Sequence, residues 1–171
     1  MSEPKFVHLR VHSQFSLIDS VLSVKQLIKE AAKQEMPAVG LTDHCNFFGL
    51  VKFYKAALGA GVKPIIGSDF IISESSDFSD DALVTLIAMN EKGYKNITEI
   101  ISLAYLEGQS LGVARIKWQW LEQYNEGVIA LSGAKFGAIG TQLLKDNIAQ
   151  AEGLLKNFRE DAAPTIGAGI F

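Results

Sequence analysis

The chain has 171 residues, of which 48% are hydrophobic and 20% are charged, a composition typical of a globular core with a hydrated surface. Its net charge of −3 gives no sign of the basic character expected of a protein that binds nucleic acid by bulk electrostatics. A single cysteine, Cys45, excludes an internal disulfide and favours a reducing compartment. The N-terminal residues lack an apolar signal region and no run of about 18 apolar residues occurs, so we predict a cytoplasmic protein.

The first predicted element is a strand within residues 4–20, in which apolar and polar side chains alternate. Its polar row consists of His8, Arg10 and His12, and its apolar row of Val7, Leu9 and Val11. Three inward polar groups need partners or a ligand. The row ends near Ser13, at the carboxyl end of the strand, which is where α/β proteins place their sites.

Strand and helix patterns then alternate along the chain. Ser23 and Gln26 form a capping box at the start of a helix that reaches about Gln34. The further predicted strands cover 37–43, 62–72, 82–90 and 127–133, and the further helices cover 47–61, 94–108 and two segments between 138 and about 160. Residues 109–125 are expected to be irregular, apart from one helical turn. The alternation predicts a parallel sheet, either open or closed into a barrel.

Chemically active side chains gather at the ends of the first predicted strands. They are His8, His12, Asp43, His44 and Asp69. Converging imidazoles and carboxylates are the ligands of a zinc, manganese or iron hydrolase that activates water against a phosphoester. Taken one at a time, each residue also has a structural interpretation: a hydrogen-bonded histidine, a helix-capping aspartate, or, for Cys45, a small turn residue.

Five motifs then identify a known family: FVHLRVHSQFSLID, AVGLTDHCNFFGLVKFY, AGVKPIIGSDF, IAMNEKGYKNITEIIS and NEGVIALSG. In this order and spacing they resemble the PHP (polymerase and histidinol phosphatase) domain at the N-terminus of bacterial DNA polymerase III alpha subunits. The resemblance covers residues 4–160. It implies a PHP-type distorted (β/α)7 barrel, of which this chain would hold the first five or so strand–helix units as an open parallel sheet. We therefore expect a PHP domain over 1–161 and a divergent tail or the mark of a truncation over 162–171.

The departures from the family motifs concern its metal ligands. Metal-binding members carry His-x-His in the first strand, and here that pair falls on Arg10 and His12. Arginine cannot lose its proton and is no ligand. A family histidine falls on Leu83 and a family cysteine on Ala134, whereas the glutamate of G-x-E falls on Asp69, which is shorter by one methylene.

The resemblance therefore implies a vestigial pocket without a catalytic residue, made of His8, Arg10, His12, Asp43, His44 and Asp69. Of these, His12, Asp43 and His44 are the remaining candidates for metal ligands. We expect no cofactor, and zinc or manganese if the site is functional. Because Arg10 brings a permanent positive charge, we predict that it replaces the metal by a charge-assisted bond to Asp43, Asp69 or both.

Two hypotheses of function follow from the resemblance. The first is a non-catalytic domain of a replicative DNA polymerase, which supports the polymerase body and docks the proofreading exonuclease subunit. Its partners would be the other domains of the alpha subunit, that exonuclease subunit and, through the parent polymerase, DNA, with no membrane involved. The second is a metal-dependent phosphoesterase or 3′–5′ exonuclease. Trp118, Trp120 and Phe136 are the apolar candidates for an exposed docking surface.

Overall fold

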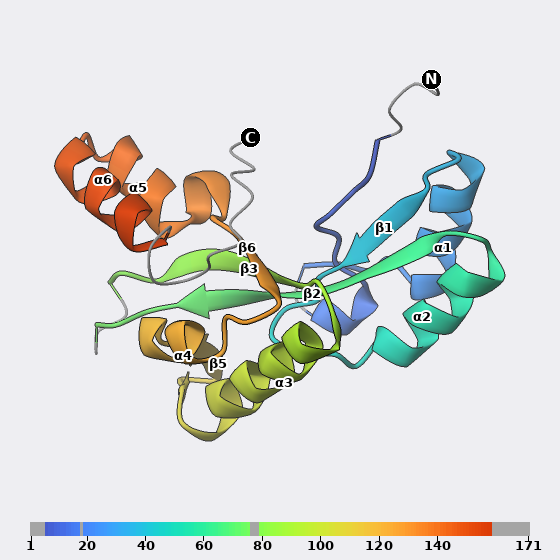
Figure 1. Ribbon diagram of the computed structural model, residues 1–171, viewed down its shortest axis with the longest axis horizontal. Helices are drawn as coiled ribbons and strands as arrows, with labels where there is room; N and C mark the ends of the chain where they lie inside the picture. The colour runs from blue at the N-terminus through green and yellow to red at the C-terminus, as the bar shows by residue number, and fades with distance from the viewer. Residues whose placement is uncertain (1–5, 18, 76–78, 159–171) are drawn as a thin grey trace. The chain divides into compact units, whose positions relative to one another are not determined.

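The computed structural model describes residues 6–17, 19–75 and 79–158, and the predicted tail at 162–171 lies outside them. The chain divides into two compact units, Met1–Ser68 and Asp69–Phe171, and strand β2 (Lys63–Ile72) passes from one to the other. Figure 1 labels the α-helices and most of the strands of both units. Within the described ranges, none of the helices has the length and apolar character needed to cross a membrane.

The first unit packs two helices against a parallel strand pair. Its elements are η1 (Gln14–Ser16), α1 (Val24–Lys33), β1 (Ala38–Leu41), α2 (Leu50–Gly59) and the start of β2. Strand β1 pairs in parallel with β2, from Ala38 opposite Lys63 to Leu41 opposite Ile66. The core of this unit consists of Val24, Leu27, Ile28, Ala31, Val39, Leu41, Phe53, Ala57 and Val62. These side chains come from both helices, from β1 and from Val62 just before β2, so the helix and strand patterns predicted for 24–34, 37–43 and 47–61 are confirmed here.

The predicted first strand is wrong, because residues 6–13 form no regular strand. They run beside β1 and accept two backbone hydrogen bonds, from the Gly40 N–H to the His8 carbonyl (2.7 Å) and from the Thr42 N–H to the Val11 carbonyl (2.9 Å). The approach is close, since a Cβ atom on Gly40 would lie 2.2 Å from the Leu9 carbonyl oxygen. Leu9 is 42% exposed, so the alternating pattern does not produce the fully buried apolar row that would hold a strand in place.

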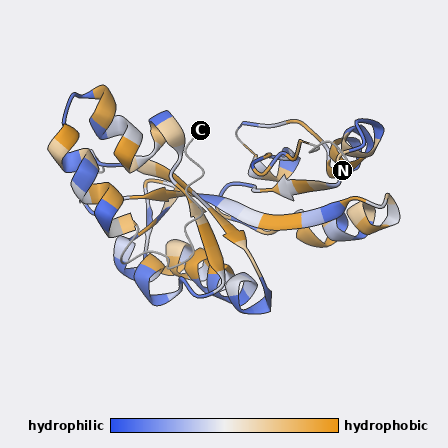
Figure 2. Cartoon of the chain, turned by 45° about the horizontal axis from the view of Figure 1, so that its top comes forward, coloured by the Kyte–Doolittle hydropathy of each residue, from blue (hydrophilic) through white to orange (hydrophobic). Residues whose placement is uncertain are grey.

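The second unit contains a sheet with more strands than the pair in the first unit, together with its own helices. After β2 come β3 (Ala82–Ala88), α3 (Glu91–Leu106), β4 (Gln109–Ser110), β5 (Val113–Ile116), α4 (Trp118–Gln123), β6 (Val128–Leu131), η2 (Ala134–Phe136), α5 (Ala138–Leu144) and α6 (Ile148–Asn157). The strand order is β4-β5-β2-β3-β6. Figure 2 shows the strands of this sheet largely in the orange of hydrophobic residues, and β3 is buried along most of its length, as predicted for its apolar run.

The predicted α/β class is confirmed, but the sheet is mixed, so the prediction of a parallel sheet is wrong. β2 pairs in parallel with β5, but β3 pairs antiparallel with β6 and β4 antiparallel with β5. The irregular segment predicted at 109–125 contains the β4–β5 hairpin. Its two turn residues, Leu111 (φ 52°) and Gly112 (φ 79°), both have positive φ, as the tightest hairpin turns require. Strands this short carry too few residues for a period of two to be recognised.

The apolar candidates for a docking surface have different environments. Trp120 is 6% exposed and therefore part of the core, which corrects its assignment as a surface residue. Trp118 is half-buried, with its ring edge-on to Phe158 at 4.9 Å between centroids. Phe136 is 64% exposed. Only Phe136 of the three therefore remains a clear surface candidate.

Candidate functional site

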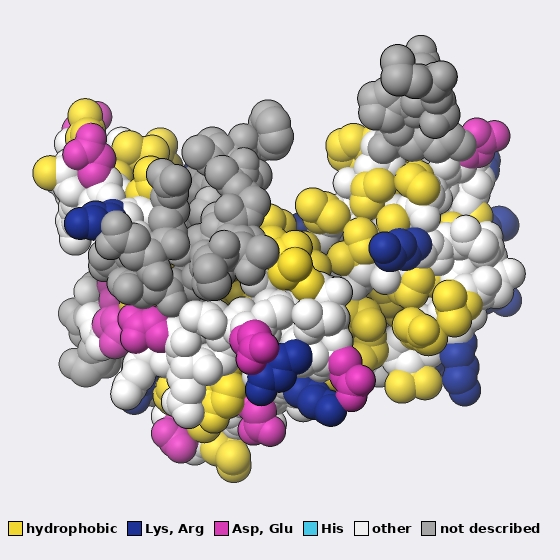
Figure 3. Space-filling model, viewed as in Figure 1, with side chains coloured by type: hydrophobic (Ala, Val, Ile, Leu, Met, Phe, Trp, Pro, Cys, Tyr) yellow, Lys and Arg dark blue, Asp and Glu magenta, His cyan; other side chains and the backbone are white. Residues whose placement is uncertain are grey.

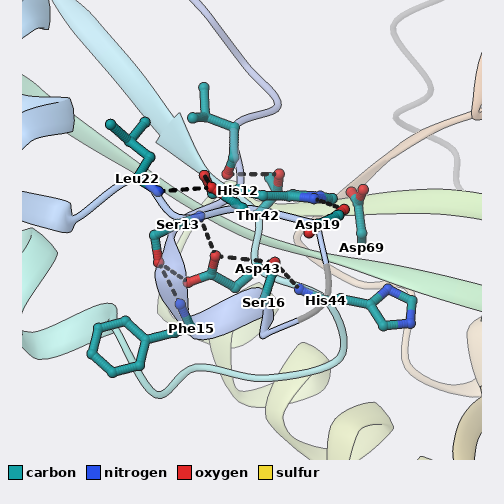
Figure 4. A network of polar contacts seen from close by, with 12 residues as sticks. His12, Ser13, Phe15, Ser16, Asp19, Leu22, Thr42, Asp43, His44 and Asp69 are labelled. Atoms are coloured by element: carbon teal, nitrogen blue, oxygen red, sulfur yellow. Dashed lines mark hydrogen bonds and ion pairs between the residues drawn. The ribbon is translucent and has the colours of Figure 1, made fainter.

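A buried polar centre of the first unit is built around Asp43, which follows β1 and is 2% exposed (Figure 4). Its Oδ1 accepts hydrogen bonds from the Ser13 backbone N–H (2.6 Å) and the Ser16 hydroxyl (3.2 Å). Its Oδ2 accepts the Ser13 hydroxyl at 2.8 Å. The Asp43 carbonyl in turn accepts the Ser68 hydroxyl at 2.7 Å. A buried carboxylate with three neutral donors is satisfied without a counter-ion.

The same bonds tie two separate segments of the chain together. Ser13 is the N-cap of η1 and Ser16 is its last residue, so this one turn presents all three donors to Asp43. The Ser16 hydroxyl also accepts the His44 backbone N–H at 3.0 Å. The Asn46 side-chain amide donates to the Phe15 carbonyl at 3.0 Å. Asp43 therefore acts as the anchor that holds η1 on the carboxyl end of β1.

The donors of the Asp43 carboxylate are Ser13 and Ser16, not the histidines or Arg10, and the His44 ring points away from that carboxylate (Figure 4). His12 is half-buried, and its Nδ1 lies 2.6 Å from Asp19 Oδ2. His8 is exposed, with its ring edge-on to Phe6 at 4.7 Å between centroids. Arg10 is also exposed, and the donors that the structure gives to Asp43 are serines rather than its guanidinium. A bond from Arg10 to the carboxylate of the third strand stays a prediction.

That carboxylate, Asp69, begins the second unit. It is fully buried, and its Oδ1 accepts the hydroxyl of Thr85 from β3 at 2.6 Å. Two of the three positions where a family ligand is lost lie in the same unit, with Leu83 in β3 and Ala134 at the start of η2 with a φ of 48°. As with Asp43, a neutral hydroxyl donates to Asp69.

Sequence reasoning placed Asp43 in a site but missed its partners. Ser13, Ser16 and Thr85 carry the hydroxyls that hold the buried carboxylates, and all three side chains are themselves buried. The only signal in the sequence is the pair of serines three residues apart directly after the predicted strand. That spacing is typical of a capped turn, and it does not show that both hydroxyls face an aspartate about 30 residues further along the chain.

The residues present do not fit the metal centre of the family. Among residues 6–17, 19–75 and 79–158, no three His, Cys, Asp or Glu side chains are grouped so that they could hold a metal ion. Arg10 offers no lone pair. The Asp43 oxygens face the hydroxyl and amide donors of η1. This donor set is that of a structural carboxylate.

Cys45 is not a nucleophile in this arrangement. It is 1% exposed, and burial raises the pKa of its thiol to about 12. The thiolate, which is the reactive form, is therefore almost absent at neutral pH. With a φ of 47°, Cys45 occupies the left-handed turn that follows Asp43 and His44, in agreement with its interpretation as a turn residue.

A family comparison agrees with the motifs. The family model described as "PHP domain" matches residues 8–165, so the chain belongs to the PHP domain family. Among solved structures, an amidohydrolase from Chromobacterium violaceum is similar with a TM-score of 0.44 and 18% identity, over 96% of this chain and 58% of that one.

The curated relatives narrow the family to one kind of protein. The chain is 50% identical over 153 residues to DNA polymerase III subunit alpha of Vibrio cholerae, which covers 89% of this chain and 13% of the relative. It is 48% identical over 155 residues to the same subunit of Pseudomonas aeruginosa, and 45% identical over 162 residues to that of Escherichia coli K12. These alignments cover 13% and 14% of the two relatives, so the chain spans a small fraction of their length.

Proposed function

We propose that this chain is the PHP part of a DNA polymerase III alpha subunit, and that it serves DNA replication as a non-catalytic scaffold. In this role it supports the polymerase body and docks the proofreading exonuclease subunit, and it meets DNA through the parent polymerase. Catalysis of nucleotide transfer would belong to the remainder of the parent chain, because that reaction needs carboxylates that hold two metal ions about 4 Å apart.

One observation carries the proposal: Asp43, the best-preserved carboxylate of the family motif, is used as a structural anchor. Its two oxygens accept three hydrogen bonds from Ser13 and Ser16. Turning it towards a metal would release a buried backbone N–H and a buried hydroxyl, which costs about 1–3 kcal/mol for each unsatisfied group. With Arg10 in place of a ligand as well, we propose no resident zinc or manganese and assign no catalytic residue.

The second unit offers exposed apolar surface that suits a docking role. Around α5 and α6, Phe136, Leu143, Leu144 and Ile148 are between 52% and 73% exposed. Figure 3 shows yellow, hydrophobic side chains over the part of this unit where the two helices lie. Neighbouring exposed apolar side chains of this kind are typical of surfaces that another domain or subunit covers.

The docking role is tested by titrating the purified exonuclease subunit into the purified chain in a calorimeter. We expect saturable binding, and we expect the Phe136→Asp/Leu144→Asp variant to bind about tenfold or more weakly, because a charge would be buried at the interface. Leu111→Asp is the matched control, since Leu111 is 89% exposed in the β4–β5 turn, away from α5 and α6 in the sequence. Absence of binding by the unchanged chain would contradict the docking role.

A second candidate function, a metal-dependent phosphoesterase or 3′–5′ exonuclease, is favoured by one contact. The Asp19 carboxylate lies 2.6 Å from Nδ1 of His12. A carboxylate in this position is the partner that commonly orients a metal-ligating histidine. The same contact fits a purely structural role, in which Asp19 fixes the His12 ring next to the η1 turn. We therefore keep the scaffold as the main proposal.

A further inference from the structure

The charge of this chain is divided unevenly between its two units. Residues 1–68 contain eight Lys and Arg and five Asp and Glu, whereas residues 69–171 contain eight and fourteen. The formal charges are therefore +3 and −6, which together give the −3 of the whole chain. The first unit is therefore basic, although the whole chain is acidic.

The excess positive charge of the first unit is concentrated on its two helices. Together α1 and α2 carry five lysines, Lys25, Lys29, Lys33, Lys52 and Lys55, and a single acidic residue, Glu30. All five lysines are exposed, three on α1 and two on α2, and we use the name lysine face for this set. The Lys52 ammonium also lies 5.0 Å from the centroid of the Phe15 ring. By contrast, α3 of the second unit balances two lysines with two glutamates, and one pair, Lys95 and Glu91, is bonded at 2.7 Å. The excess is thus a property of α1 and α2.

The three lysines of α1 form a regular row. Lys25, Lys29 and Lys33 follow one another at intervals of four residues, about 6 Å along the helix axis, on the side opposite the buried stripe that includes Leu27 and Ala31. Evenly spaced cations on a rigid helix suit a polyanion with evenly spaced charges. Within the described residues, one weak ion pair involves this row. It joins Lys33 and Glu30 at 3.9 Å, and both side chains are exposed.

Helix α2 adds an aromatic side chain to the positive charges. Tyr54 is next to Lys55 in the sequence and is 46% exposed, whereas Lys52, two residues earlier, lies on another side of α2. Phe48, just before the helix, is 65% exposed. Figure 3 shows dark-blue Lys and Arg side chains among yellow ones over the first unit. Lysines that contact the phosphates, with exposed aromatic rings on which bases stack, are the usual elements of a surface that binds single-stranded nucleic acid without sequence preference.

We propose that the lysine face of the first unit binds single-stranded DNA through its backbone, with Tyr54 as a stacking partner for a base. This inference rests on the proposed function, since it gives the PHP part of a replicative polymerase direct contact with a strand. An acidic protein segment or an anionic lipid surface would also be attracted by the lysines, but neither would stack on the tyrosine.

The test is fluorescence anisotropy of a labelled oligothymidylate with the purified chain at 50 mM and 200 mM salt. We expect a Kd between about 10⁻⁴ and 10⁻⁶ M near physiological salt, as for non-specific binding, and tighter binding at 50 mM salt. If all five lysines contact phosphates, the slope of log K against log salt is about −3.5, and the K25Q/K29Q/K33Q variant reduces it by about 2. K92Q/K95Q on α3 is the control for loss of general positive charge, and it leaves the slope unchanged.

Two further measurements separate the possible ligands. We expect Tyr54→Leu to weaken oligothymidylate binding about fivefold or more, because a base loses its stacking partner. Poly-glutamate of equal charge is the comparison ligand, and we expect it to bind the variant and the unchanged chain equally. Phosphatidylserine vesicles test the lipid alternative. The inference is overturned if oligothymidylate does not bind at 50 mM salt, or if K92Q/K95Q weakens binding as much as the α1 variant. It is also overturned if only the vesicles or poly-glutamate bind.

The result is independent of the docking experiment. A chain that binds the exonuclease subunit and not oligothymidylate would overturn this inference and leave the scaffold proposal intact. A chain that binds oligothymidylate and not the exonuclease subunit would do the reverse. Thermal unfolding of each variant, followed by circular dichroism, controls for folding, because exposed lysine substitutions are expected to change stability by less than about 0.5 kcal/mol.

Discussion

At the scale of single residues, the carboxylate that matches the family motif is held by serine donors. Asp43 is buried, and its three donors come from Ser13 and Ser16. The position of Asp43 in a site could be predicted from the sequence, because a carboxylate directly after a short apolar strand is a recognisable pattern. Its role could not, because the partners lie 27 and 30 residues away and become neighbours only in the folded unit.

If Asp43 is an anchor, its serine donors contribute to stability. We expect Ser13→Ala to lower the free energy of unfolding by about 1–3 kcal/mol, because a buried carboxylate oxygen loses a donor. Ser16→Ala should cost less than Ser13→Ala, since its bond to Asp43 is longer, at 3.2 Å. Urea denaturation followed by circular dichroism measures both changes.

The control for the serine variants is Ser102→Ala. Ser102 is exposed on α3 and donates to the Thr98 carbonyl at 2.9 Å, so its loss should change stability by less than about 0.5 kcal/mol. Equal stability of the Ser13 and Ser102 variants would show that Asp43 does not need its donors, and the anchor interpretation would fail.

At the scale of elements, local signals predicted the helices better than the strands. The capping box at Ser23 and Gln26 predicted the start of α1, and both of its hydrogen bonds are present. Three features were missed for different reasons. Residues 6–13 alternate in sequence but lack a buried face, β5 is only four residues long, and the antiparallel pairing of β3 with β6 depends on the path of the chain between them.

The cap of α1 gives a prediction at this scale. The Ser23 side chain accepts the Gln26 backbone N–H at 3.2 Å. We expect Ser23→Ala to lower the free energy of unfolding by about 0.5–2 kcal/mol in urea denaturation. The reason is that the Gln26 N–H, which has no acceptor within the helix, loses the Ser23 hydroxyl. Ser23→Asp should retain most of the stability, since aspartate caps equally well. A Ser23→Asp variant as unstable as Ser23→Ala would show that the cap is not the cause.

At the scale of the whole molecule, the family could be predicted from five motifs in order, and the match over residues 8–165 confirms it. The motifs are long and specific, so they can still be recognised when a single ligand position is changed, as at Arg10. Neither the division into two units nor their opposite charges could be predicted in the same way, because both depend on which parts of the chain pack together. The alignments cover 13% of two of these relatives, so the relatives are several times longer than this chain, and the scaffold role stays a proposal.

We propose that Asp43 is a structural residue and that its surroundings carry no metal-dependent chemistry. The most direct test is elemental analysis of the purified chain after mild dialysis, with assays of phosphoester hydrolysis on single-stranded DNA and small phosphates. We predict zinc and manganese far below one equivalent and no hydrolysis, with Asp43→Asn leaving both results unchanged. One or more equivalents of metal that are lost in Asp43→Asn, together with hydrolysis that falls with them, would contradict the scaffold account and establish the phosphoesterase.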